Sequence, residues 1–128
     1  MKKHIRSGSP YEDTIGFARA VRYGNRVLVS GTAPVPAPGT ALAPDAYHQM
    51  LRCGEIIRDA LEQAGCGMEH VLRTRMYLTD AADAEGVGRA HRELFGAARP
   101  AATMVVVAAL LDSKWKIELE AEAEVPTA

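Results

Sequence analysis

The sequence predicts an α+β protein in which a mixed, antiparallel-rich sheet carries two helices on one face. Apolar and acidic residues alternate along the last strand, from Trp115 to Val125. Two earlier segments, 45–65 and 80–96, instead place apolar residues at helical spacing. The resulting order is strands, helix, strand, helix, strand, strand, which is typical of helices segregated to one side of a sheet.

Length and composition favour one ordinary domain over residues 1–128. The chain is 48% hydrophobic and carries a formal net charge of −1, which fits a globular protein with a single core. No block of like charge indicates nucleic-acid or membrane binding. The start, Met1 to Ser9, lacks the apolar region of a secretory signal, so we expect a cytoplasmic protein.

The N-terminal part reads as strands followed by a loop. We expect a β region from about Lys3 to Thr32, ending in a hairpin of strands 17–22 and 26–30 around Tyr23-Gly24-Asn25. Residues 33–44 hold four of the seven prolines and predict an irregular connection.

Each predicted helix has a start and a stop signal. Asp45 is a candidate N-cap for a helix that ends at Gly65, and Asp80 is one for a helix that ends at Gly96. One face of each is apolar and is expected to pack on the sheet; these residues are Met50, Gly54, Ile57 and Leu61 in the first helix, and Val87, Ala90, Leu94 and Phe95 in the second.

Two further strands are expected between and after the helices. In the strand from His70 to Thr79, Leu72, Thr74, Met76 and Leu78 face one way, and Val71, Arg73, Arg75 and Tyr77 the other. The run Ala101 to Leu111 is almost wholly apolar, which predicts a strand covered on both faces at the centre of the sheet.

Two helices cover only one face of such a sheet, so another partner must cover the second. Self-association is the economical solution, with Arg73 and Arg75 pairing with glutamates of the last strand across subunits. The glutamate row also has an ordinary interpretation as a solvated face. Glu118 differs, because a carboxylate opposite the apolar run lies in a partly dry cleft and can orient water or accept a proton.

Several segments, taken in order along nearly the whole chain, resemble the RidA/YjgF/L-PSP family. They are Gly16-Phe17-Ala18-Arg19-Ala20-Val21, Val29-Ser30-Gly31-Thr32, Val71 to Asp80, Arg99-Pro100-Ala101 and Lys116-Ile117-Glu118-Leu119-Glu120-Ala121. The resemblance implies a chorismate-mutase-like fold and a homotrimeric barrel with clefts between subunits. It also implies hydrolysis of small enamines or imines to 2-keto acids without a cofactor.

The family's pattern is kept here only in part. Ser30 and Gly31 match ligand-binding positions, and Glu118 matches the glutamate that holds the attacking water. Ala102 stands where deaminases carry the arginine that grips a substrate carboxylate, which places the chain in a divergent branch. Phe17 replaces a tyrosine, Gly88 an asparagine and Met104 a cysteine.

The resemblance therefore predicts Glu118 as the catalytic residue. The predicted ligand-binding residues are Phe17, Arg19, Ser30, Gly31, Arg75, Ala102, Thr103 and Met104. Arg19 or Arg75 would restore a positive charge to the cleft, and the alternative for each is a structural ion pair with the glutamates.

Three functions remain open from the sequence. The first is binding, with hydrolysis, of an imine, enamine or carbonyl metabolite, including a larger substrate admitted by the small Ala102 and Gly88. The second is a non-catalytic ligand-binding or regulatory trimer, which the loss of the arginine favours. The weakest is an endoribonuclease or translation inhibitor, since no basic stripe or histidine pair supports it. The separate histidines and the two isolated cysteines, Cys53 and Cys66, predict neither a metal site nor a disulfide framework.

Overall fold

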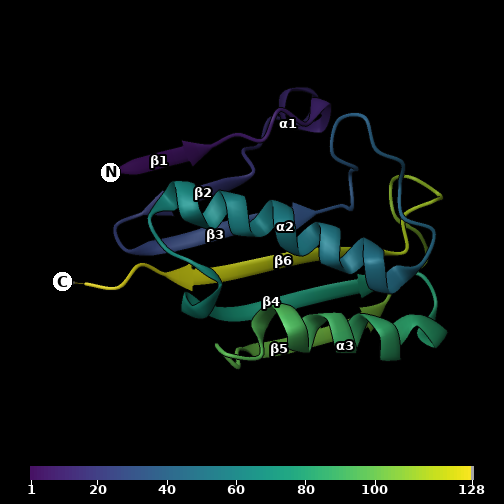
Figure 1. Cartoon of the computed structure of the whole chain (residues 1–128). Coiled ribbons are helices and arrows are strands. Elements are labelled where there is room, and N and C mark those ends of the chain that lie inside the picture. Colours follow the sequence, from purple (N-terminus) through teal and green to yellow (C-terminus); the bar gives the residue numbers. More distant parts are fainter. Residues whose placement is uncertain (128) are drawn as a thin grey trace.

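The computed structural model describes residues 1–127 and contains one six-stranded sheet with two long helices on one face (Figure 1). The sheet order is β1-β2-β3-β6-β4-β5, with β4 and β5 parallel and all other neighbours antiparallel. The elements are β1 (Lys2–Ile5), α1 (Pro10–Ile15), β2 (Ala20–Tyr23), β3 (Arg26–Thr32), α2 (Ala46–Ala64), η1 (Met68–His70), β4 (Val71–Leu78), η2 (Ala81–Asp83), α3 (Ala84–Phe95), β5 (Ala101–Val106) and β6 (Ile117–Glu124).

The two long helices begin and end near the predicted residues. The Asp45 side chain accepts a hydrogen bond from the backbone N–H of His48, and Gly65 closes α2 with a left-handed φ of 97°. Asp80 caps the short turn η2, and α3 follows from it and ends before Gly96. The predicted α+β fold with helices on one face is confirmed.

The core lies between the helices and one face of the sheet. Ile117, Leu119, Ala121 and Ala123 of β6 are all fully or almost fully buried, as the alternation predicted. The glutamates between them lie on the opposite face of the sheet. The side chains of β6 therefore alternate between the packed face of the sheet and an open, charged face.

The prediction that residues 101–111 form the centre of the sheet was wrong. The strand β5 covers only Ala101–Val106 and lies at the sheet edge, where it pairs with β4 alone. Most of its side chains are exposed in the single chain, including Val105 and Val106. The apolar run predicted a strand covered on both faces, and in the single chain β5 is not covered in this way.

The pattern predicted for β4 is wrong at its first two residues. Val71 is buried and Leu72 is 48% exposed, the reverse of the expected facing. The register with β6 shifts between Val71 and Arg73, and such an irregularity turns the side chains before it to the other face. From Thr74 onward the predicted alternation is confirmed.

The expected β region before Thr32 also contains a helix that the sequence analysis missed. Ser9 accepts a hydrogen bond from the backbone N–H of Tyr11, and Pro10 occupies the first turn of α1. Gly16 ends the helix with a φ of 91°. The predicted hairpin is confirmed as β2 and β3. No helix among the described residues is long and apolar enough to cross a membrane.

Candidate functional site

Five predicted site residues come together around one cavity of about 220 Å³ beside α1. They are Phe17, Arg19, Ser30, Gly31 and Glu118. The cavity lies where β3 loses its regular pairing with β6, between Val29 and Thr32. Beside this irregularity the Glu118 carboxylate of β6 lies against the backbone of Gly31.

Glu118 places a carboxylate in the lining of the cavity. Its carboxylate is partly buried and accepts no hydrogen bond from any described residue. Burial raises the pKa of Glu118 above its ordinary value; the charge of Arg19 opposes this shift, and that of Glu120 adds to it. The site therefore contains a carboxyl group that gains a proton more readily than a solvated one.

The position of Gly31 has no room for a side chain beside the Glu118 carboxylate. A Cβ atom at this position would lie 2.3 Å from Oε2 of Glu118 and 3.2 Å from its carboxyl carbon. Any side chain would therefore displace the carboxylate. The glycine lets the glutamate lie directly against the backbone of β3.

Arg19 supplies a positive charge from the opposite wall. Its side chain is buried, and Nη2 donates to the carbonyl of Gly31 at 2.8 Å. The guanidinium carbon lies 5.2 Å from the centre of the Phe17 ring. Nε is buried and has no hydrogen-bond partner among residues 1–127. Burial lowers the pKa of Arg19, and the nearby carboxylates of Glu12 and Glu118 oppose this. The group remains a cation.

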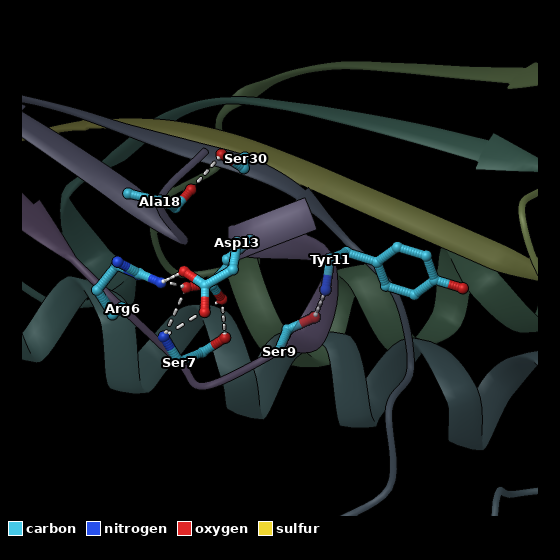
Figure 2. A network of polar contacts seen from close by, with 8 residues as sticks. Arg6, Ser7, Ser9, Tyr11, Asp13, Ala18 and Ser30 are labelled. Carbon is cyan, nitrogen blue, oxygen red and sulfur yellow. Dashed lines mark hydrogen bonds and ion pairs between the residues drawn. The ribbon is translucent and has the colours of Figure 1, made fainter. Parts of the chain in front are cut away.

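Ser30 fixes the wall from which Phe17 and Arg19 project. Its hydroxyl donates to the carbonyl of Ala18 at 2.7 Å, and its backbone N–H donates to the carbonyl of Arg19 at 3.0 Å. Figure 2 shows the Ser30 hydroxyl directed at Ala18. The contacts of Ser30 within the chain are therefore structural, and only its remaining lone pair is available to a ligand.

The buried carboxylate of Glu12 holds α1 beside the cavity. It accepts from Arg6 Nε at 3.1 Å and from the backbone N–H and the hydroxyl of Ser7. Its backbone carbonyl accepts from the N–H groups of Gly16 and Phe17. Hydrogen bonds from Ser7 and Arg6 lower the pKa of Glu12 although burial opposes them. Figure 2 shows the neighbouring Arg6–Asp13 contact of the same network.

The other predicted site residues do not reach this cavity within one chain. Arg75 donates from Nη1 to Glu122 at 3.2 Å and lies 3.5 Å from Glu120, so the expected pairing with glutamates forms inside the chain. Ala102 and Thr103 are exposed on β5, and Met104 is half-buried against the core.

Sequence reasoning missed the apolar part of the cavity. Tyr11 and Ile15 of α1, Val35 of the proline-rich loop, and Leu111 and Trp115 before β6 also line it. The Ser9-Pro10 pair was the available signal for α1, because Ser is a frequent N-cap and Pro a frequent first helical residue. No local pattern connects Val35 or Leu111 with Glu118.

Cys53, His91 and His48 lie apart from this cavity. Cys53 is fully buried, and burial raises the pKa of its thiol far above the ordinary value. His91 lies 2.7 Å from the hydroxyl of Thr74, and His48 lies beside Asp45. Among residues 1–127, no three His, Cys, Asp or Glu side chains are grouped to hold a metal ion.

Comparison with known proteins shows which family this chain resembles. The model of the family described as Endoribonuclease L-PSP matches residues 10–125. The uncharacterized protein SCO2049 of Streptomyces coelicolor is 40% identical over 121 residues, which cover 94% of this chain and 90% of that protein. A RutC family protein of Pyrococcus abyssi, PYRAB12510, is 32% identical over 73% of this chain and 75% of its own length.

A solved structure agrees with the sequence comparisons. Rv2704 of Mycobacterium tuberculosis, a member of the YjgF/YER057c/UK114 family, superposes with a TM-score of 0.88 at 38% identity, covering 98% of this chain and 100% of that chain. The resemblance seen in the sequence is confirmed: this chain belongs to the Endoribonuclease L-PSP family, the group also called RidA/YjgF.

Proposed function

We propose that the cavity binds a small imine, enamine or carbonyl metabolite and that Glu118 promotes its hydrolysis. The observation that carries the proposal is the Glu118 carboxylate, which faces the cavity without a hydrogen-bond partner among the described residues. Glu118 is partly buried, and the other glutamates of the same face of β6, Glu120 and Glu122, are paired with donors of this chain. A carboxylate that is left free at a cavity, with a raised pKa, is suited to exchange a proton with water or substrate.

The reaction needs one proton acceptor that later acts as a donor. Water adds to the carbon of a protonated C=N bond while Glu118 takes a proton from the water. The neutral carboxylic acid then returns that proton to the nitrogen. As the C–N bond breaks and the C=O bond forms, Glu118 takes the proton of the new hydroxyl group and passes it to the departing ammonia. A protonated imine and water thus give a ketone and an ammonium ion with no change of oxidation state, so the step needs no cofactor.

Arg19 is the proposed partner of a ligand's negative charge. Ala102 cannot bind a carboxylate, and Arg75 already contacts Glu120 and Glu122. Arg19 lines the cavity that contains Glu118, and its charge acts on the Glu118 carboxyl, whose pKa it lowers against the effect of burial. A guanidinium favours planar anions such as carboxylates.

A homotrimer with clefts between subunits is part of the proposal. It is supported by the edge strand β5, whose residues Val105 and Val106 are 42% and 54% exposed in one chain. In such an assembly the strand β5 of a neighbouring copy, which carries Ala102 and Thr103, would lie beside the cavity, whereas Met104 packs against the core of its own chain. Light scattering coupled to size-exclusion chromatography should give three times the mass of 13.8 kDa. A monodisperse monomer would contradict this part.

The chemical test uses imines that are generated in the assay mixture. An L-amino-acid oxidase releases imines, semicarbazide competes for them, and an active protein diverts them to 2-keto acid and ammonia. We expect the wild type to lower semicarbazone formation and Glu118→Gln to abolish the effect. Glu122→Gln is the matched control, because it lies on the same face of β6 but pairs with arginines. An inert wild type would overturn the catalytic proposal in favour of a binding-only protein, and a Glu118→Gln variant as active as the wild type would overturn the role given to Glu118.

A further inference from the structure

The cavity has an apolar end that the proposed hydrolysis does not use. Ile15 and Leu111 are 61% and 70% exposed although both are large and apolar, and Val35 is 39% exposed. Together with Tyr11 and Trp115 they line the part of the cavity not formed by Arg19 and Glu118. Clustered exposed apolar side chains at a cavity indicate a surface that a ligand covers.

The aromatic part of this wall is held in place by the fold. The rings of Tyr11 and Trp115 meet edge to face, with centroids 6.0 Å apart and planes inclined by 68°. Trp115 is only 7% exposed. Since Trp115 also lines the cavity, its largely buried ring forms a fixed part of the wall.

Buried Gln49 of α2 anchors the chain on both sides of Trp115. Its amide donates to the carbonyl of Lys114 at 3.1 Å and accepts from the N–H of Lys116 at 2.8 Å. The carbonyl of Val35 accepts from Arg52 Nε at 2.7 Å, which ties the opposite wall to the same helix. The apolar end is thus preformed, so a ligand meets a defined shape rather than a flexible loop.

The volume limits the size of the ligand. A dry apolar cavity of about 150 Å³ is large enough to bind benzene. The cavity of about 220 Å³ therefore has room for one six-membered ring or a branched aliphatic group together with a short polar head.

We propose that the site selects 2-imino or 2-keto acids with an aromatic or branched apolar side chain, which packs against Tyr11, Ile15, Leu111 and Trp115. The polar head then points to Arg19 and Glu118. This inference rests on the proposed function and adds the substrate class to it. Substrates with a methyl side chain leave the apolar wall exposed and gain less from binding.

The test compares imines derived from phenylalanine, leucine and alanine in the semicarbazide competition, each measured as kcat/KM. The wild type should favour the phenylalanine and leucine imines over the alanine imine by at least about tenfold. Ile15→Ser and Leu111→Ser should reduce this ratio severalfold. Both residues are exposed, so the variants should fold. Leu72→Ser, on β4 and 48% exposed, is the control and should keep the wild-type ratio.

A binding measurement separates the two proposals. Phenylpyruvate and pyruvate are titrated calorimetrically into the intact protein, without any turnover. Tighter binding of phenylpyruvate that Ile15→Ser weakens supports the substrate class even when no imine is hydrolysed. Equal treatment of the three imines, or a preference that neither Ile15→Ser nor Leu111→Ser alters, would overturn the substrate class and leave hydrolysis by Glu118 standing.

Discussion

Replacing Gly31 by alanine should separate the function of the site from the stability of the fold. The new Cβ atom would lie 2.3 Å from Oε2 of Glu118, whereas carbon and oxygen atoms approach to about 3.3 Å at closest. The carboxylate must therefore move by about 1 Å. A displacement of that size in a catalytic group costs about 100-fold in rate, which equals about 2.7 kcal/mol of transition-state stabilisation.

The stability of the same variant should change little. Gly31 does not have a positive φ, so alanine adopts its backbone conformation without strain, and the shorter list of unfolded conformations stabilises by about 0.4–1 kcal/mol. Moving the flexible end of Glu118 offsets part of this gain. Keto-acid release and thermal unfolding, measured on one preparation, give both quantities. A Gly31→Ala variant with the wild-type rate would refute the reasoning, as would one that fails to fold.

Further predictions concern stability. The Glu118→Gln variant should be more stable than the wild type at neutral pH, because a raised pKa means that ionised Glu118 destabilises the folded state. The difference in the free energy of unfolding should vanish as the pH falls below the ordinary pKa of 4.5. A difference in urea unfolding that does not depend on pH would contradict this prediction. The Gln49→Leu variant should lose about 3 kcal/mol of unfolding free energy, because the substitution removes three hydrogen bonds of a buried amide. Gln63→Leu, on the exposed side of the same helix, is the control and should lose almost none in the same denaturation series. Burial lowers the pKa of His91, so the stability of the protein should fall as the pH drops below 6.5, the pKa of an unfolded histidine. In melting curves recorded from pH 7.5 to 5, His91→Gln should make this fall smaller. A pH profile that the substitution leaves unchanged would contradict the prediction.

The fold was largely predictable because its helices and its central strand carry local signals. The caps at Asp45 and Gly65 and the alternation along β6 each reflect a short-range physical preference. The position of β5 was not predictable in this way. An apolar strand has the same sequence pattern whether its own chain or another molecule covers it, and most side chains of β5 are exposed in the single chain.

The candidate site was predictable only where the family resemblance reached. Phe17, Arg19, Gly31 and Glu118 gather at one cavity although a hundred residues separate the ends of this set. Arg75 seemed equivalent to Arg19 in sequence, but its neighbours across β6 are Glu120 and Glu122. No local pattern in the sequence predicted the irregular pairing of β3 with β6, beside which Arg19 and Glu118 line one cavity.

The ionisation of Glu118 tests the central claim most directly. The signal of its carboxyl carbon can be followed by NMR from pH 3 to 9, first in the free protein and then with phenylpyruvate present. The account predicts a pKa above the ordinary value of 4.5 in the free protein and a further change when the ligand binds. A carboxyl that titrates at or below its ordinary value, and does not respond to the ligand, would contradict it.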